Sequence, residues 1–332
     1  MNIFESNILV TGGLGFMGSS FIRCLLQDLR FQGSIYNLDA LTYAANFMNL
    51  GTFSDDPRYR FIEGNILDKV LLQRLHSQHN FHFIVHFAAE THVDRSIASP
   101  RTFLETNILG TFELLQLVRE NPGLHFHHVS TDEVYGALGS DGAFHEKSPY
   151  LPNSPYSASK AASDHLVRSY VQTYGICATV SHACNNYGPG QYPEKLIPLM
   201  IERASRGAQL PIYGEGREIR EWLYVDDHSC ALIHILEKGL SGEVYNISGE
   251  KEITNIELVR YLLKKMASFL KQPYSTFESL ITFVENRPGH DYRYALSSKK
   301  MRELGWASSV SLDEGLERTI CWYLNPVDIK IV

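Results

Sequence analysis

An apolar run, Asn7–Thr11, passes directly into a glycine-rich turn in the stretch NILVTGGLGFMG (residues 7–18). The glycines that matter are Gly12, Gly15 and Gly18, a GxxGxxG spacing rather than GxGxxG. Such glycines permit a tight turn and bring the backbone close to a pyrophosphate, which the free N–H groups of the following helix bind. The stretch therefore predicts a strand–turn–helix unit that holds a dinucleotide.

An acidic residue follows at the expected distance. Asp39 lies 21 residues after Gly18 and ends a second predicted strand, Ser34–Asp39. A carboxylate there accepts hydrogen bonds from the adenosine ribose and repels a 2′-phosphate, so NAD is expected rather than NADP. A glycine-rich turn without a ligand is the alternative, but it does not explain strand, glycines, helix and acid in this order.

Short β-branched runs alternate with amphipathic stretches through the first half of the chain. This alternation predicts an α/β fold with a doubly wound parallel sheet of the Rossmann type. Besides the two strands above, the expected strands are Phe81–Phe87, Leu124–Ser130 and Ile176–Ser181, and the expected helices are Gly18–Leu29, Leu67–Gln78, Pro100–Arg119 and Ser154–Tyr174.

The second half loses the alternation. Loops are expected to dominate from Asn185 to Gly216, with helices at Ile256–Leu270 and Leu312–Leu324. We expect a dinucleotide-binding domain over 1–182, to which about 222–248 returns, and a smaller α/β substrate domain over 183–332. The smaller domain should cap the carboxyl ends of the strands, where ligands bind in open α/β sheets.

Composition excludes several functional classes. The net charge of −7 over 332 residues argues against a nucleic-acid partner. The five cysteines have no metal-ligand spacing and predict free, mostly buried thiols in a reducing compartment. No apolar run approaches the ~18 residues of a membrane span, and a strand that begins at Asn7 leaves no room for a signal peptide. A cytoplasmic protein is expected.

His125, His127 and His128 have no accompanying acidic or Cys ligand at a metal spacing, so no metal is predicted.

Tyr156 and Lys160 form a Tyr-x-x-x-Lys pair on a predicted helix. Residues i and i+4 share a helix face, so the phenol and the ammonium can reach one ligand. A nearby cation should lower the pKa of the tyrosine, which could then take the proton of a sugar hydroxyl. A surface Tyr–Lys pair is the alternative.

Thr131, Asp132 and Glu133 end a predicted strand, at the edge where the cofactor is expected. Thr131 can bind the same substrate oxygen as Tyr156. A dehydrogenase or an epimerase needs no carboxylate there, so the acidic pair predicts further proton transfers, such as removal of a carbon-bound proton and protonation of a leaving hydroxyl. A solvated acidic pair or a helix cap is the alternative.

With these motifs the sequence resembles the extended short-chain dehydrogenases, and within them the dTDP-glucose 4,6-dehydratases. The resemblance covers nearly the whole chain, and its most telling element is Thr131-Asp132-Glu133, because related epimerases carry small residues at the two acidic positions. Its other segments are 88–96 (AAETHVDRS), 131–136 (TDEVYG), 185–189 (NNYGP), 192–198 (YPEKLIP), 220–228 (REWLYVDDH) and 287–291 (RPGHD).

The resemblance implies a reaction and a role for each matched residue. Tyr156, with Thr131 and Lys160, would deprotonate the C4 hydroxyl of the sugar as hydride passes to NAD+. Glu133 would remove the C5 proton, and Asp132 would protonate the departing C6 hydroxyl. Hydride would return to C6 and a proton to C5, giving a 4-keto-6-deoxy sugar and regenerating tightly held NAD.

The resemblance also implies binding residues. Cofactor contacts are expected from Gly12, Gly15, Phe16, Met17, Gly18, Asp39, Ala40, Leu41, Thr42, Asn65, Ile66, Ala88, Ala89, Thr106, Tyr156, Lys160 and Asn186. Substrate contacts are expected from Thr91, Thr131, Asn185, Lys195, Leu196, Pro211, Tyr213, Arg220, Asn255, Arg287 and His290. Arg220 is the favoured ligand of the diphosphate, since a guanidinium fork matches phosphate oxygens. Its alternative is a surface salt bridge with Glu218 or Glu221.

Four positions depart from the family pattern. Asn65 replaces Asp, Thr91 replaces Ser, Gly190 replaces an aromatic residue and His182 replaces Arg. The last two bear on the nucleotide and the sugar rather than on the reaction. One alternative is therefore the same reaction on a UDP-, CDP- or N-acetylated hexose. A 4-epimerase and a non-catalytic NAD-binding regulator are two further alternatives. The helices at 100–119 and 154–174 are expected to form a homodimer interface.

Overall fold

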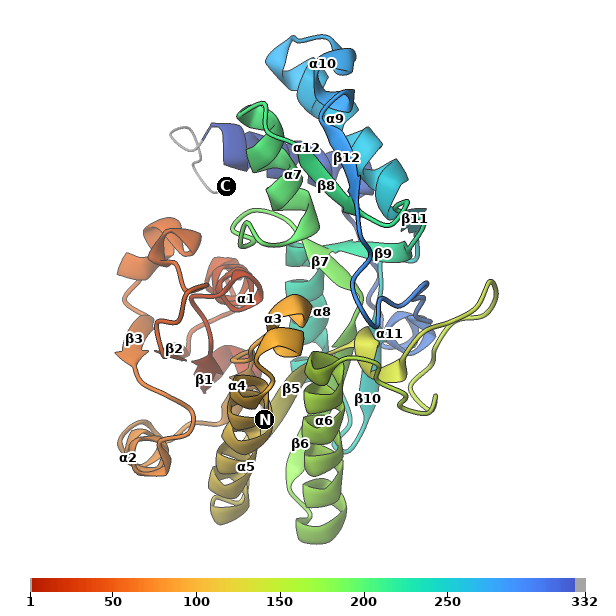
Figure 1. Cartoon of the computed structure of the whole chain (residues 1–332). Coiled ribbons are helices and arrows are strands. Elements are labelled where there is room, and N and C mark those ends of the chain that lie inside the picture. The colour runs from red at the N-terminus through yellow and green to blue at the C-terminus, as the bar shows by residue number, and fades with distance from the viewer. Residues whose placement is uncertain (1, 326–332) are drawn as a thin grey trace.

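The computed structural model describes residues 2–325 and is built on a seven-stranded parallel sheet (Figure 1). Its strand order is β10-β6-β5-β4-β1-β2-β3, which confirms the doubly wound α/β prediction. The strands are β1 (Asn7–Thr11), β2 (Ser34–Asp39), β3 (Tyr59–Glu63), β4 (Phe83–His86), β5 (His125–Thr131), β6 (Cys177–Ala183) and β10 (Val244–Ile247).

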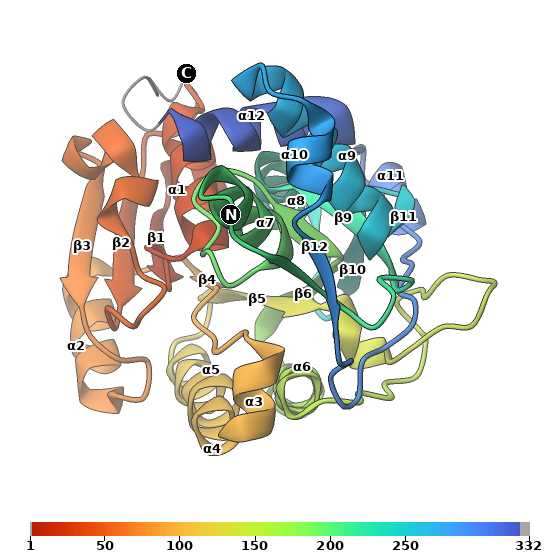
Figure 2. The same ribbon diagram turned by 45° about the horizontal axis from the view of Figure 1, so that its top comes forward.

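Both faces of this sheet are covered, because apolar side chains point alternately to either side of each buried strand. In β1, Ile8 and Val10 pack into one core, and Leu9 packs into the other. The first core includes α1 (Phe16–Gln27) and α8 (Val225–Lys238), and the second includes α2 (Lys69–His79), α5 (Thr111–Glu120) and α6 (Pro155–Tyr174). Figure 2 shows α5 and α6 together on one side of the sheet and α1 on the other.

The predicted helix at 100–119 is present but irregular. It consists of α4 (Arg101–Phe103), a seven-residue π-helical segment labelled η4 (Leu104–Gly110), and α5. Asn107 in the π segment is buried; its side chain donates to Ser159 Oγ at 2.8 Å and accepts from the Glu90 N–H at 2.9 Å. These bonds tie the irregular segment to α6 and to the loop after β4.

The C-terminal part forms a smaller α/β unit. A three-stranded sheet has the order β11-β9-β7, and β8 pairs with β12. These elements are β7 (Asn185–Tyr187), β8 (Leu210–Tyr213), β9 (Ile219–Tyr224), β11 (Glu252–Thr254) and β12 (Ile281–Val284), with α7 (Leu196–Ser205), α9 (Asn255–Leu270) and α12 (Leu312–Leu324). A third apolar core joins them. The prediction of loops from Asn185 to Gly216 is therefore wrong. Pro198 suits the first turn of α7, where its missing N–H is not needed.

After β9 the chain returns to the large sheet, where α8 packs against α1 and β10 extends the sheet beside β6. The remaining short elements are η1 (Ile3–Glu5), η2 (Phe47–Asn49), η3 (Gly51–Asp55), α3 (Val93–Ala98), η5 (Asp132–Tyr135), α10 (Tyr274–Glu278) and α11 (Lys299–Glu303).

The five thiols are free, but the expectation that most are buried is wrong, since Cys230 and Cys321 are exposed and only Cys184 is fully buried. None of the helices within residues 2–325 combines the length and apolar character of a membrane-crossing helix. Within the same range, no three His, Cys, Asp or Glu side chains gather as metal ligands would.

Candidate active site

A cavity of about 320 Å³ lies at the carboxyl ends of the central strands, between the two parts of the chain. Most of the predicted site residues line it, although they come from segments far apart in the sequence. The predicted residues found there are Gly12, Gly15, Phe16, Met17, Gly18, Asp39, Ala40, Thr42, Asn65, Ile66, Ala88, Ala89, Thr91, Thr106, Thr131, Asp132, Glu133, Tyr156, Lys160, Asn185, Asn186 and Lys195.

The glycine turn has the geometry of an anion cradle. Gly12 has φ +71°, and a Cβ there would lie 2.8 Å from the Ala88 backbone. A Cβ on Gly18 would lie 2.5 Å from the Gly12 oxygen, so the close turn requires both glycines. The N-cap of α1 is Gly15, which has no side chain to cap the first N–H groups. Those groups stay available to a phosphate at the helix N-terminus.

Asp39 lies beside this turn and is buried. One carboxylate oxygen accepts the Leu14 N–H and the other accepts the Leu41 N–H, each at 3.0 Å. Burial raises the pKa of Asp39, although these two bonds oppose the rise. Leu41 itself does not line the cavity; it lies in a turn with φ +53° and supports Asp39 through its backbone.

A second feature fits a bound dinucleotide. The side-chain oxygen of Asn186 is buried at the cavity wall and has no hydrogen-bond partner in the described part of the chain. An unpaired buried acceptor costs about 1–3 kcal/mol, and a donor on a bound molecule would remove that cost. The glycine cradle, the carboxylate and this acceptor together fit NAD.

Tyr156 and Lys160 project from the first turns of α6. This helix begins sharply, because Ser154 forms a capping box with Ser157 and Pro155 occupies the first helical position. Both side chains are buried, and Lys160 Nζ donates to the Val129 oxygen at 2.8 Å. Burial lowers the pKa of Lys160 to about 8.

The expected lowering of the tyrosine pKa is not observed. The pKa of Tyr156 is raised, first because the phenol is buried and next because Glu133 is negatively charged nearby. These two effects outweigh the hydrogen bond with Thr131, which lowers the pKa, and the Lys160 ammonium donates to the Val129 oxygen.

Asp132 and Glu133 follow β5 in the short helix η5; Asp132 is buried and Glu133 is half-buried. Burial and then the Glu133 charge raise the pKa of Asp132 well above its usual range. One of its oxygens accepts a hydrogen bond from Thr131 at 3.3 Å, and the other has no partner among residues 2–325. Burial also raises the pKa of Glu133, but the cations Arg287, Lys195 and Arg220 oppose that rise.

On the substrate side, Thr91, Asn185 and Lys195 line the cavity. Seven further predicted residues do not: Leu196, Pro211, Tyr213, Arg220, Asn255, Arg287 and His290. Leu196 begins α7, Pro211 lies in β8, and Asn255 begins α9 with its N–H bonded to the Glu218 oxygen.

Arg220 does not form the surface salt bridge that was the alternative for it. It is buried, and it donates to the backbone oxygens of Ile219, Asp291 and Tyr292 at 2.8, 2.7 and 3.2 Å. Its guanidinium carbon lies 4.2 Å from the centre of the Tyr294 ring. No carboxylate of residues 2–325 lies within salt-bridge distance of it, and its charge lowers the pKa of Asp132 and of Glu133.

Asp94 was not among the predicted site residues, although it lies in the 88–96 segment. Its carboxylate accepts the Tyr213 hydroxyl at 3.1 Å and lies 3.5 Å from Arg287 Nη1. His290 packs edge-on against Tyr213 and bonds the Asn286 side chain at 2.6 Å. Gln191, Tyr192 and Glu194 line the cavity and were also missed, though Tyr192 and Glu194 stand in the 192–198 segment.

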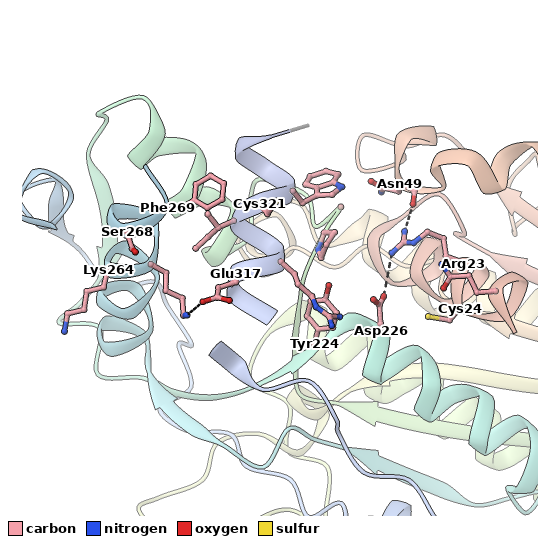
Figure 3. A pocket seen from close by; sticks show the side chains of 17 residues that line it. Arg23, Cys24, Asn49, Tyr224, Asp226, Lys264, Ser268, Phe269, Glu317 and Cys321 are labelled. Atoms are coloured by element: carbon pink, nitrogen blue, oxygen red, sulfur yellow. Dashed lines mark hydrogen bonds and ion pairs between the residues drawn. The ribbon is translucent and has the colours of Figure 1, made fainter. Parts of the chain in front are cut away.

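A larger cavity, of about 940 Å³, contains none of the predicted catalytic residues (Figure 3). In Figure 3, Arg23 and Asp226 face Lys264 and Phe269 across it, and Glu317 lies between them. We assign the chemistry to the smaller cavity, because the perturbed carboxyl groups and the glycine cradle are there.

The parallel sheet, the glycine cradle with Asp39, and the Tyr156–Lys160 pair define a dehydrogenase/reductase of the Rossmann type. Residues 9–319 match the sequence model of the family described as GDP-mannose 4,6 dehydratase. A dTDP-glucose 4,6-dehydratase of Neisseria gonorrhoeae is 48% identical, over 97% of this chain and 96% of that protein. One of Escherichia coli is 44% identical, over 96% and 93%. The chain belongs to the family of the dTDP-glucose 4,6-dehydratases.

Solved structures agree with this family. A dTDP-glucose 4,6-dehydratase of Streptomyces venezuelae, solved with NAD, has a TM-score of 0.89 at 46% identity and covers 96% of both chains. A UDP-glucose 4-epimerase of Thermotoga maritima also shares the fold, with a TM-score of 0.84 at 30% identity, covering 96% of this chain and 98% of that one.

Proposed function

We propose that this protein is an NAD-dependent hydro-lyase that converts dTDP-glucose to dTDP-4-keto-6-deoxyglucose. The observation that carries the proposal is the contrast between Asp132 and Glu133. Asp132 is buried with one unpartnered oxygen and a raised pKa, whereas Glu133 lies within reach of three cations. Neighbouring carboxyl groups in contrasting surroundings are the arrangement that lets one act as acid and the other as base.

The residues divide the proton transfers among them. Tyr156 takes the proton of the C4 hydroxyl, which Thr131 and Lys160 help to orient. Glu133 removes the C5 proton, made acidic by the new C4 ketone, and returns it at the end. Asp132, whose raised pKa favours the protonated form, gives its proton to the C6 hydroxyl, which leaves as water.

The cofactor is held by the glycine cradle, Asp39 and Asn186. When bound, NAD would supply reversible hydride transfer and a positive charge that favours the Tyr156 phenolate.

Lys195, Arg220 and Arg287 supply the positive charge that an anionic nucleotide sugar requires. The positive charges of all three lower the pKa of Glu133, so they lie around the place where the sugar must react. We assign the diphosphate to Arg220 and Arg287, with Tyr213 and His290 beside them.

The test is direct. Purified protein is incubated separately with dTDP-glucose, UDP-glucose, CDP-glucose, an N-acetylated UDP-hexose and GDP-mannose. We expect the alkaline absorbance of a 4-keto sugar and the loss of one water by mass spectrometry with dTDP-glucose. Product from another donor only would overturn the substrate assignment, and an isomer of unchanged mass would indicate an epimerase.

We also propose a cytoplasmic homodimer. The helical run 101–120 and α6 lie side by side on one face of the sheet (Figures 1 and 2). Leu104 and Leu109 are about half exposed, and Tyr174 at the end of α6 is 49% exposed. A second copy would cover these apolar side chains.

A further inference from the structure

The active-site cavity opens to solvent where its walls meet. Five of its lining residues are exposed, and the others are half-buried or buried; the exposed ones are Ala40, Thr42, Asn65, Thr91 and Tyr192. The first four belong to loops of the large sheet, whereas Tyr192 belongs to the smaller unit. Ala40 directly follows Asp39, which is expected at the adenosine ribose, so a bound dinucleotide would lie beside this opening.

Three side chains cross this opening and contact one another; we call Glu194, Tyr43 and Arg95 the Glu194 cluster. The Tyr43 hydroxyl donates to Glu194 Oε1 at 3.1 Å, and Arg95 Nη2 lies 3.2 Å from Glu194 Oε2. The guanidinium carbon of Arg95 lies 3.7 Å from the centre of the Tyr43 ring. Tyr43 follows β2 and Arg95 lies in α3, both in the large unit, whereas Glu194 precedes α7 in the smaller unit. The cluster therefore joins the two sides of the opening.

The exposed residues at the opening are neighbours of the cluster. Thr42 precedes Tyr43 in the chain, and Tyr192 packs edge-on against the Tyr43 ring, with the ring centres 5.4 Å apart. Beside them, Lys195 Nζ donates to the Thr91 oxygen at 2.9 Å. A molecule that leaves the cavity between Thr42 and Tyr192 must therefore break these contacts.

The hydrogen bond between Tyr43 and Glu194 suits a closed opening. Burial raises the pKa of Tyr43, and the charges of Glu194 and Glu90 raise it further, so the hydroxyl keeps its proton and remains a donor. Glu194 lines the cavity, and only 13% of its side chain is exposed. A hydrogen bond to a carboxylate is stronger than one between neutral groups, and water screens it less when the carboxylate is mostly buried. We therefore expect this bond to contribute most to closure.

The reaction gives a reason to keep the opening closed, and here the inference rests on the proposed function. One cofactor molecule is needed twice in each turnover, for oxidation at C4 and for reduction at C6. If it left between these steps, the sugar would stay oxidised and the enzyme would be inactive. Because the cofactor is regenerated, it need not exchange between turnovers. A contact that slows its release therefore does not slow the reaction.

We propose that the Glu194 cluster retains the dinucleotide by closing its exit from the active-site cavity. Tyr43 and Arg95 position Glu194 across the opening, and the cofactor leaves only after their contacts with Glu194 break. The cluster takes no part in the chemical steps. Contacts that merely held the two units together would not affect cofactor release more than other contacts between those units, so the two roles can be distinguished.

The experiment follows the release of NAD from the holoenzyme. Protein loaded with NAD is mixed with an NAD glycohydrolase, which destroys released cofactor, and the nucleotide that remains on the protein after gel filtration is measured over time. Tyr43→Phe removes the hydrogen bond but keeps the ring against Arg95, and we expect it to lose NAD about tenfold faster than wild type. Glu194→Ala should lose NAD at least as fast. The double variant should be no faster than Glu194→Ala, because both changes remove the same bond.

Ser309→Ala is the matched control. The Ser309 hydroxyl donates to Asp227 Oδ1 at 2.6 Å and so joins the segment before α12 to α8 of the large unit, but neither residue lines the cavity. This variant should therefore lose NAD at the wild-type rate.

Wild-type release of NAD from Tyr43→Phe would overturn the proposal, as would equal acceleration in Ser309→Ala, which would indicate a general loosening of the two units. If Glu194→Ala does not fold, Tyr43→Phe and Ser309→Ala decide between these outcomes. A wild-type protein that retains NAD but forms no 4-keto product would instead overturn the proposed function, so the two failures can be told apart.

Discussion

Lys195 Nζ donates a hydrogen bond to the backbone oxygen of Thr91 at 2.9 Å. The bond crosses the cavity, joining the start of α7 to the loop after β4. Asp94 reinforces it by bonding Tyr213 and pairing with Arg287. These contacts hold the cations of the smaller unit against the carboxyl ends of the large sheet, where they act on Glu133.

Glu133→Gln should separate oxidation from dehydration. The amide cannot remove the C5 proton, so C4 should be oxidised while water loss stops. We expect reduced nicotinamide to accumulate on the enzyme, seen by its absorbance, and product formation to fall by about 10²–10⁴-fold. Dehydration at the wild-type rate would show that Glu133 is not the base that removes the C5 proton.

Arg220→Gln should move the pH profile. Arg220 lowers the pKa of Glu133, so its loss raises that pKa further. The carboxylate form is then lost at a higher pH, and the acidic limb of log kcat/KM should shift upward, by about one pH unit. Arg217→Gln is the control, because Arg217 is exposed and pairs with Glu215. An unchanged pH profile in Arg220→Gln would contradict the effect of Arg220 on the pKa of Glu133.

Asp132→Asn should stabilise the fold while it slows water loss. The pKa of Asp132 is raised in the folded protein, so ionisation opposes folding. Its stabilising contribution is present below the unfolded pKa and is lost as pH rises through the folded pKa. The variant should therefore gain on the order of 1 kcal/mol at neutral pH, measured as Tm, and the gain should vanish near pH 3. An equal gain in Tm at both pH values would contradict a raised pKa of Asp132 in the folded protein.

Asp39→Asn should weaken discrimination between dinucleotides. The neutral amide no longer repels a 2′-phosphate, and it has one acceptor oxygen in place of the two that now bind the Leu14 and Leu41 N–H groups. We expect NAD to bind about tenfold more weakly and NADP to bind more tightly than in wild type. Isothermal titration of protein stripped of nucleotide measures both. Unchanged preference would mean that another residue selects NAD.

Leu109→Glu should disrupt the dimer. Leu109 is 52% exposed in the π segment, and a buried charge at a subunit interface would be unpaired. Light scattering at micromolar concentration should show a dimer for wild type and a monomer for the variant. Leu29→Glu, at a 93% exposed position after α1, should stay dimeric. A monomeric wild type would exclude the interface.

Local sequence was sufficient for the elements whose neighbours lie close in the chain. The strands at Asn7–Thr11 and Ser34–Asp39 and the helix at Leu312–Leu324 have the predicted bounds. The turn at Gly12, Gly15 and Gly18 was also predictable, because a left-handed φ and a close helix–strand approach both require glycine. Tyr156 and Lys160 share one helix face through spacing alone.

Only the tertiary structure decided the rest. The strands of the smaller sheets have three to six residues and pair with distant segments, so no local period marks them. Adjacency in sequence could not distinguish Asp132 from Glu133, since the charges that oppose the pKa rise of Glu133 but not that of Asp132 come from Lys195 and Arg287, which lie in other elements. The direction of the pKa shift of Tyr156 was predicted wrongly for the same reason. Spacing places Lys160 near Tyr156, but burial and the Glu133 charge, which raise the pKa of the tyrosine, depend on the assembled fold.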